Sequence, residues 1–268
     1  MPENHPLLHW LLPTGGDGRD PGRLVRVARA AEEAGFGSLL TPVGPGCTDP
    51  WTLAPALCRR TERISFLISC RAGFASPTVL AQQADAFRRF AGGRLGLNVI
   101  TGTDTDSDGR RPHGDRPTHD QRYGRTDEVM AALRDLLDGK RIDFQGAHVQ
   151  VEGAQLADPA VAYKVPLYFG GASPAAEDVA VRRADVHILW SEPGEDPAAV
   201  AAQVARVRDR NPSLRLALRV PLTDRDAVDE VVQRLSGYAE SGIDEFILSG
   251  SRAHLEVAPR LRELRAAA

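Results

Sequence analysis

The sequence has few cysteines, no long apolar run and no surplus of basic residues. Its three cysteines, Cys47, Cys58 and Cys70, are an odd number without C-x-x-C spacing, so we expect free thiols in a reducing cytoplasm and no metal site. Nowhere do about 18 apolar residues run together, and no basic region precedes the short apolar run near the start. We therefore expect a soluble protein that is not exported and does not bind membranes.

Charge and length narrow the class further. The 33 basic and 36 acidic residues give a net charge of -3, and basic residues do not cluster with aromatic ones, which argues against a nucleic-acid partner. With 268 residues, 42% of them hydrophobic, the chain can bury one sizeable core and is close to the size of one closed barrel. We expect one domain over residues 1–268.

Short apolar runs alternate with segments of helical period along the whole chain. The runs include LHWLLP, GSLLTP, ISFLIS, RLGLNVIT and VPLYFG. The helical segments are residues 21–34, 50–61, 77–90, 123–137, 174–183, 197–208, 227–239 and 254–267. Continuously apolar strands indicate a covered parallel sheet, and eight strand-helix units predict a (β/α)8 TIM barrel.

Local signals set some of the boundaries. Asp20 is suited to cap a helix that begins at Pro21 and stops at Gly35, and Asp196 precedes Pro197 in the same way. The passages EAGFGSLL and ESGIDEFI resemble one another, with Gly35 matching Gly242. This weak repeat is typical of one βα unit reused around a barrel.

In barrels of this kind a site is built from the loops that follow the strands. The loop FGGASP carries two glycines and then opens a helix, an arrangement that suits a phosphate at the helix N-terminus. A plain helix cap made by Ser173 fits these residues equally well. Residues 102–121 form the longest loop and mimic the spacing of a calcium loop, but Arg110, Arg111 and Pro112 interrupt it, so we favour a solvated charged lid.

Several strings together resemble the luciferase-like monooxygenase family, and most closely its alkanesulfonate monooxygenase branch. They are LLPTGGDG, TPVGPGCTDPW, SPTVLAQQADAFRRFAGGRLGLNVITGTD, HDQRYGRTDE, PLYFGGASPAAEDVA, LWSEP and GIDEFILSG. They follow in the same order over nearly the whole chain. The resemblance implies a flavin site at the C-terminal mouth of the barrel.

The resemblance also assigns roles to matching positions. The catalytic candidates are Arg219, Cys47 and His119. The cofactor-binding candidates are Arg71, Asn98, Thr101, His119, Tyr123, Gly171, Ala172, Ser173 and Trp190. Arg219, with Arg71 as second choice, is expected to meet an anionic head group, since a guanidinium binds a multi-oxygen anion through paired hydrogen bonds. A structural ion pair for Arg219 and core packing for Trp190 are the alternatives.

The implied chemistry is oxygenation by reduced FMN. A separate flavin reductase supplies the FMN, molecular oxygen converts it to a flavin peroxide, and in the sulfonate branch this attacks a small anionic organosulfonate. The resemblance further implies a homodimer. The alternatives are a flavin-binding homologue or partner subunit that has lost oxygenation, and an unrelated phosphate-ester enzyme on the same barrel.

The chain departs from the sulfonate branch in ways that leave its substrate open. The long lid insertion after the seventh strand is missing, Gly15 replaces a histidine, and Pro221 stands where the branch has a histidine two residues after the arginine. SGSRAHLE also replaces a tyrosine-containing string. These losses predict a larger or more open pocket.

Overall fold

Eight parallel strands close into a barrel in the computed structural model, which describes residues 6–16, 20–102, 117–190 and 197–266. Around the ring they follow the order β1-β10-β9-β8-β7-β4-β3-β2. Their bounds are β1 (Leu7–Leu11), β2 (Ser38–Thr41), β3 (Ser65–Arg71), β4 (Leu95–Ile100), β7 (Leu167–Gly170), β8 (Val186–Trp190), β9 (Arg215–Pro221) and β10 (Glu245–Ser249). The expected TIM barrel is thus confirmed.

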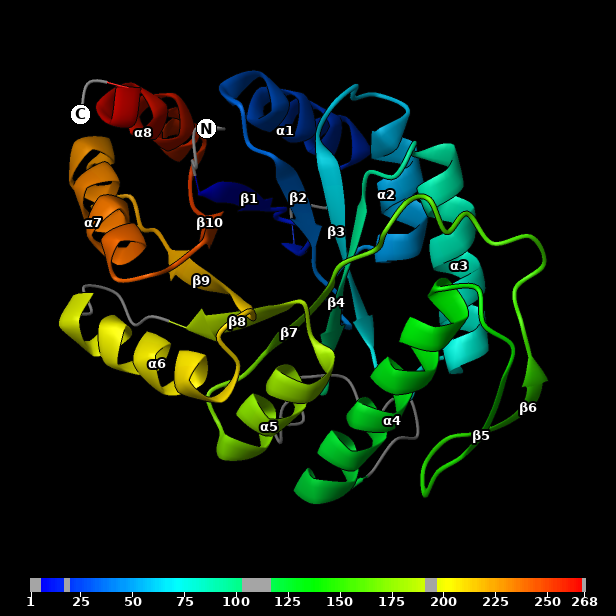
Figure 1. Ribbon diagram of the computed structural model, residues 1–268. Helices are drawn as coiled ribbons and strands as arrows, with labels where there is room; N and C mark the ends of the chain where they lie inside the picture. Colours follow the sequence, from blue (N-terminus) through cyan, green and yellow to red (C-terminus); the bar gives the residue numbers. More distant parts are fainter. Residues whose placement is uncertain (1–5, 17–19, 103–116, 191–196, 267–268) are drawn as a thin grey trace.

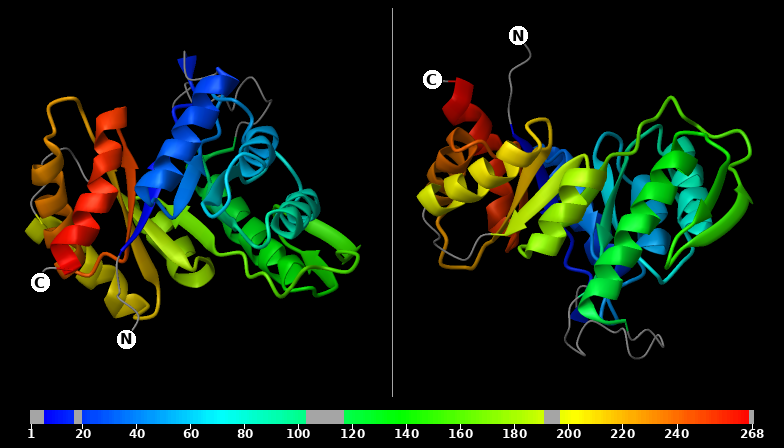
Figure 2. Two further views of the ribbon diagram at one scale, coloured as in Figure 1. Left: turned by 90° about the horizontal axis from the view of Figure 1, so that it is seen from above. Right: turned by 60° about the horizontal axis from the view of Figure 1, so that its bottom comes forward.

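Helices lie outside the ring of strands (Figures 1 and 2). Over the described residues they are α1 (Pro21–Ala34), α2 (Pro50–Cys58), α3 (Pro77–Phe90), α4 (His119–Leu137), α5 (Pro174–Arg183), α6 (Pro197–Arg210), α7 (Val228–Glu240) and α8 (Val257–Ala266), with the 3-10 helix η4 (Arg252–Glu256) before α8. None of these described helices is long and apolar enough to cross a membrane.

Helices that begin with a capped proline were predicted best. The Asp20 carboxylate accepts hydrogen bonds from the backbone N–H groups of Gly22 and Arg23, and α1 then runs over the predicted residues. The starts and ends of α3 and α5 also match the prediction. A proline at the first helical position fixes φ and leaves no N–H unpaired, so it marks the start reliably. The expected cap Asp196 lies outside the described residues.

The start of α4 was predicted wrongly. The helix begins at His119, four residues before the predicted start at Tyr123. A reciprocal capping box holds this end, since the Thr118 hydroxyl accepts from the Gln121 N–H and the Gln121 side chain accepts from the Thr118 N–H. The polar first turn hid the helical period. The calcium-like residues Asp104 to Asp115 lie outside the described residues.

A short antiparallel hairpin, β5 (Ile142–Gln145) and β6 (Gln150–Ala154), was not predicted. It lies outside α3 and α4, at the right edge of Figure 1. The Glu128 carboxylate on α4 accepts hydrogen bonds from the N–H groups of Ala147, His148 and Val149 in its turn. A tertiary contact therefore stabilises strands whose own apolar pattern is weak.

The repeated passages do form equivalent turns. Gly35 directly follows α1 and begins the connection to β2 with φ 90°, and Gly242 lies in the α7-to-β10 connection with φ 100°. Both angles are in the left-handed region, where a side chain would be strained. The two copies of the sequence repeat thus share a glycine because both turns need a residue with positive φ.

Side chains fill the barrel interior in layers, because alternate residues of each strand point inward. The lowest layer contains His9, Tyr168 and Glu245, all buried. Tyr168 also packs in an apolar cluster inside the barrel with Leu40, Leu67, Val186, Ile188, Ala217 and Ile247. The uppermost layer, at the carboxyl ends of the strands, holds the polar residues of the candidate site.

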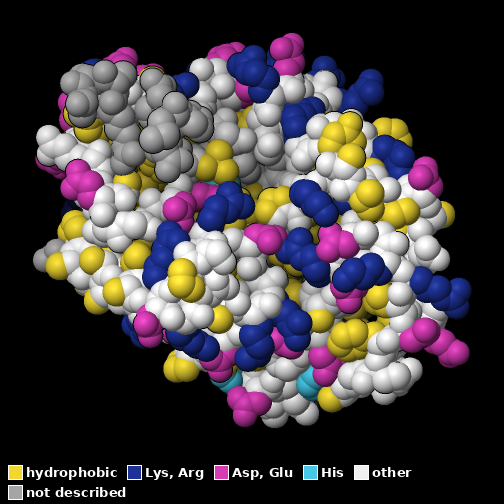
Figure 3. Space-filling model, viewed as in Figure 1, with side chains coloured by type: hydrophobic (Ala, Val, Ile, Leu, Met, Phe, Trp, Pro, Cys, Tyr) yellow, Lys and Arg dark blue, Asp and Glu magenta, His cyan; other side chains and the backbone are white. Residues whose placement is uncertain are grey.

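Charged residues on the outside join neighbouring helices. Arg183 on α5 binds the Asp127 carboxylate on α4 at 2.9 Å, and Arg206 on α6 pairs with Glu177 on α5. Figure 3 shows basic and acidic side chains intermingled on this face. These ion pairs therefore connect α4 to α5 and α5 to α6.

Candidate cofactor site

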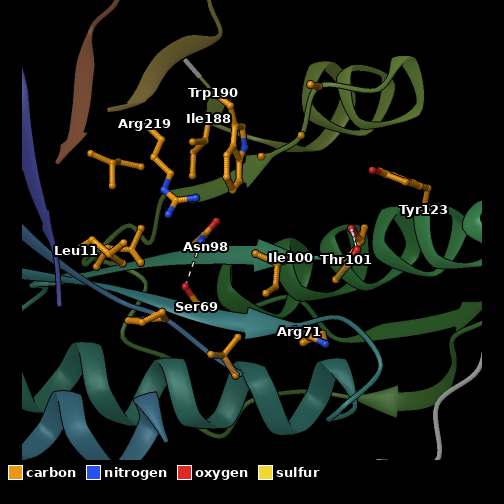
Figure 4. Close-up of a pocket in the computed structure, with 18 residues that line it drawn as sticks. Leu11, Ser69, Arg71, Asn98, Ile100, Thr101, Tyr123, Ile188, Trp190 and Arg219 are labelled. Atoms are coloured by element: carbon orange, nitrogen blue, oxygen red, sulfur yellow. Dashed lines mark hydrogen bonds between the residues drawn. The ribbon is translucent and has the colours of Figure 1, made fainter. Parts of the chain in front are cut away.

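A cavity of about 570 Å³ opens at the carboxyl ends of the barrel strands (Figure 4). All eight strands, or the residues directly after them, contribute to its wall. Its size lies within the range of small-molecule sites. The barrel mouth is thus the place where this fold can hold a ligand.

A cationic side chain and an aromatic ring form one wall. The Arg219 Cζ atom lies 4.4 Å from the centre of the Trp190 ring, and Figure 4 shows the two stacked side chains. Trp190 is 51% exposed, so it is not a core residue. Burial lowers the pKa of the Arg219 guanidinium.

Across the cavity, Asn98 on β4 and Ser69 on β3 occupy paired positions in neighbouring strands. The Asn98 Nδ2 atom donates a hydrogen bond of 3.1 Å to the Ser69 Oγ atom. The Asn98 Oδ1 atom is buried and has no hydrogen-bond partner among the described residues. A buried acceptor without a partner costs free energy unless a ligand supplies a donor.

The other end of the cavity reaches the N-terminus of α5. The Ser173 hydroxyl donates to the Tyr123 Oη atom at 3.2 Å and accepts from the Ala176 N–H at 3.2 Å. The helix cap considered for Ser173 is therefore present, beside a second hydroxyl. Gly171 has φ 153°, and a Cβ atom on it would lie 2.6 Å from the Ala176 side chain. This close approach requires glycine and brings backbone to the helix end.

The structure brings together most of the predicted site residues. Those that line the cavity are Arg71, Asn98, Thr101, Tyr123, Gly171, Ala172, Trp190 and Arg219. Ser173 is adjacent through its bond to Tyr123. Arg71 is buried at the end of β3, and its Cζ atom lies 5.0 Å from the centre of the Phe74 ring.

Besides Ser173, two predicted residues do not line the cavity. Cys47 lies in the loop after β2, where its backbone pairs with Gly15. His119 is in the exposed first turn of α4, and its ring centre is 4.8 Å from that of Tyr123. The catalytic roles assigned to both residues therefore stay predictions without a direct contact to the cavity.

The apolar part of the wall was not predicted. It is formed by Leu11, Leu40, Pro42, Val43, Ile100, Ile188 and Ile247. Ser69 was also missed. A signal existed for it: Ser69 ends the apolar run ISFLIS two residues before Arg71, and alternate residues of a strand share a face.

The fold and the cavity define a (β/α)8 barrel protein with a ligand site at its C-terminal mouth. The sequence model of the luciferase-like monooxygenase family matches residues 7–267. The chain belongs to this family, as the motifs predicted.

Solved structures with the same fold include one that contains modified FMN and one that contains an F420 adduct. EDTA monooxygenase (EmoA) from Chelativorans sp. BNC1 superposes with a TM-score of 0.82 at 16% identity, covering 97% of this chain and 94% of that one. Riboflavin lyase (RcaE), described with modified FMN and riboflavin, gives 0.82 at 16%, covering 98% and 93%. An F420-dependent secondary alcohol dehydrogenase gives 0.77 at 17%, covering 96% and 98%. At these identities the likeness shows the fold alone.

Proposed function

We propose that the protein is a monooxygenase that uses reduced FMN and molecular oxygen on a small anionic substrate. The observation that carries the proposal is the shape of the cavity. It extends from a polar and aromatic wall at Asn98, Trp190 and Arg219 to the helix end at Tyr123 and Ser173. FMN is a planar ring system joined to a phosphate, so its ring would lie at the polar and aromatic wall and its phosphate at the helix end.

The residues present fit FMN at both ends. The unpartnered Asn98 Oδ1 atom calls for a donor such as a ring N–H. The hydroxyls of Ser173 and Tyr123, together with the dipole of α5, suit the phosphate. When bound, reduced FMN supplies the electrons that activate oxygen.

The protein's own groups would position the substrate and keep water out. Among the described residues that line the cavity, the ionic side chains are Arg71 and Arg219, and none is a carboxylate or a histidine. This balance favours an anionic group near Arg219, while the apolar wall would hold the rest of the substrate.

Titration with flavins tests the proposal. We expect FMN to bind at micromolar concentration and to do so more tightly than riboflavin, because only FMN has the phosphate. Coenzyme F420 serves as the competing ligand, since barrels of this fold also occur in F420-dependent enzymes. Tight binding of F420 with no binding of oxidised or reduced FMN would refute the proposal.

Oxygen consumption separates an oxygenase from a homologue that has lost the activity. An oxygenase consumes oxygen in a substrate-dependent way without excess hydrogen peroxide. A flavin-binding homologue or partner subunit would bind FMN and release only peroxide.

Two partners complete the proposal. A separate flavin reductase would supply reduced FMN, and the protein would pair as a homodimer. Light scattering that gives a monomer mass over a wide concentration range would contradict the dimer.

A further inference from the structure

The buried histidines of the described residues differ in what meets their ring nitrogens. They are His9, His187 and His254. The His9 Nε2 atom lies 2.8 Å from the buried Glu245 carboxylate, which can compensate a positive charge. Both ring nitrogens of His254 have backbone partners, at 3.1 and 3.0 Å. His187 has neither a bonded carboxylate nor, among these residues, a partner for its second ring nitrogen.

The surroundings of the His187 ring fix its neutral form. Its Nδ1 atom lies 3.0 Å from the Phe169 carbonyl oxygen on β7. A carbonyl oxygen can only accept, so Nδ1 carries the hydrogen and donates it. The Nε2 atom is then an acceptor, which is buried and without a hydrogen-bond partner in the described part of the chain. A proton on Nε2 would add a charge and an unsatisfied N–H group in a place that water does not reach.

The charged groups that act on this ring are already paired with one another. They are Glu177 on α5 and Arg206 on α6. Arg206 Nε donates to the Glu177 carboxylate at 2.9 Å, and Arg210 lies 3.7 Å from the same carboxylate. On β9, the residue in register with His187 is the uncharged Leu216. Burial therefore dominates, and it lowers the pKa of His187 from 6.5.

His187 lies within the wall of the cavity described above. It is fully buried in β8 and directly precedes Ile188, which lines the cavity, as does Trp190 at the end of the strand. The carbonyl that it binds belongs to β7, which ends in the wall at Gly170. A change at His187 therefore acts on two strands that shape the site.

We propose that His187 makes the β7–β8 wall of the cavity sensitive to acid: uptake of a proton at Nε2 opens this wall. The inference concerns the protein without a ligand, so it is independent of which cofactor the cavity binds. The sign follows from linkage, since a folded state that keeps histidine neutral is stabilised above about pH 6.5 and loses this stabilisation as the pH falls. Below pH 6.5, the equilibrium constant for opening should rise by up to about tenfold for each pH unit, until His187 is protonated in the closed wall too.

Hydrogen exchange followed by mass spectrometry tests this, because it measures local opening segment by segment. We compare exchange at pH 7 and pH 5, corrected for the intrinsic effect of pH, in residues 167–190 and, as an internal reference, in residues 38–71. In the parent, exchange in residues 167–190 should increase about tenfold or more at pH 5. His187→Asn keeps a donor for the Phe169 carbonyl and does not titrate, so the increase should be absent.

Two further variants keep the result interpretable. His187→Gln also does not titrate and replaces His187→Asn if the smaller side chain prevents folding. His148→Asn changes an exposed histidine and should keep the pH dependence of the parent. The same increase at pH 5 in the parent and in the His187 variants would overturn the inference. An increase of equal size in residues 38–71 would also overturn it, because the opening would then not belong to the β7–β8 wall.

Discussion

The two ends of the barrel interior are built from the same strands and differ in how their polar groups are satisfied. At the amino-terminal end, the Glu245 carboxylate lies 2.8 Å from His9 Nε2, accepts from the Tyr168 hydroxyl at 2.9 Å and pairs with Arg215 at 2.9 Å. At the carboxyl end, Asn98 Oδ1 lacks a partner among the described residues. His9 Nδ1 at the lower end also lacks a partner among the described residues, but His9 does not line the cavity. Asn98 does, so its free oxygen can meet a ligand.

Strand β9 shows the difference within one element. Arg215 and Arg219 lie four residues apart on the same face, because side chains alternate along a strand. Arg215 meets the buried carboxylate Glu245, and Arg219 lies over the half-exposed ring of Trp190. Arg215 thus contributes to the structure through an ion pair with a buried carboxylate, and Arg219 contributes a cation to the cavity wall.

The largest expected effect is on stability, at the closed end. Glu245→Gln removes a buried charge that three groups share, and we expect a loss of about 3 kcal/mol in the free energy of unfolding, which lowers Tm by roughly 6–12 °C. FMN affinity of the folded variant should match that of the parent. Thermal unfolding and flavin titration measure the two quantities.

Arg215→Gln is the matched control at this end. The Arg215 side chain is 48% exposed, so its removal should cost less than about 1 kcal/mol. An unchanged Tm in Glu245→Gln, or a large loss of FMN affinity in that variant, would contradict the separation of the two ends.

The next effect is on binding, at the open end. Ser173→Ala should reduce FMN affinity at least about tenfold, since a hydrogen bond to a charged group contributes roughly 1.5–3 kcal/mol. Loss of the helix cap should also lower stability by about 1 kcal/mol. Riboflavin, which has no phosphate, should bind equally to parent and variant.

Tyr123→Phe separates binding from capping. It removes the hydroxyl bound to Ser173 and keeps the bond from Ser173 to the Ala176 N–H. We expect weaker FMN binding at unchanged stability. Equal weakening of riboflavin and FMN would show that these hydroxyls do not act on the phosphate.

A smaller effect concerns pH at the closed end. Burial alone would raise the pKa of Glu245, but its bonds to His9, Arg215 and Tyr168 outweigh burial and lower it from 4.5. A lowered pKa stabilises the fold above about pH 4.5, and this contribution is lost as the pH falls through the folded-state value. The stability difference between the parent and Glu245→Gln should therefore shrink below that pH. Urea unfolding from pH 7 to pH 3 would show it; a constant difference would mean that Glu245 does not titrate as argued.

The sequence predicted elements whose signals are local. The helices α1, α3 and α5 begin where Asp20, Ser76 and Ser173 precede a proline, and these caps act over one turn. The hairpin β5–β6 was missed because Glu128, a residue of another element, holds its turn. Patterns of period and capping carry no information on such contacts.

The sequence predicted those residues of the cavity wall that belong to family motifs. They identified Asn98, Trp190 and Arg219, all of which line the cavity. The motifs did not indicate Ser69, or that Glu245, Tyr168 and His9 meet at the other end. These groups come together through closure of the barrel, which pairs positions up to 236 residues apart.

The smallest expected effect tests the open end for a missing proton carrier. Pro221 ends β9 two residues after Arg219, on the same face of the strand, at the position where the expected resemblance to the sulfonate branch calls for a histidine. A proline side chain can neither donate nor accept a proton, and no described residue of the cavity wall is a histidine or a carboxylate. No histidine lies between Arg219 and Ser251 either, so a shift of alignment cannot restore one. We therefore expect little or no sulfite release from a panel of simple alkanesulfonates, even with FMN and a reductase present. Pro221→His should bring only a slight gain, since only residues 222–227 connect β9 to α7 and leave no room for a long lid there. Sulfite assays on both proteins measure this, with FMN titration as the control for an intact site. Sulfite release by the parent at the rate of an authentic sulfonate enzyme would show that the open end needs no histidine or carboxylate. A parent that binds FMN but releases no sulfite would direct the search to other anionic substrates.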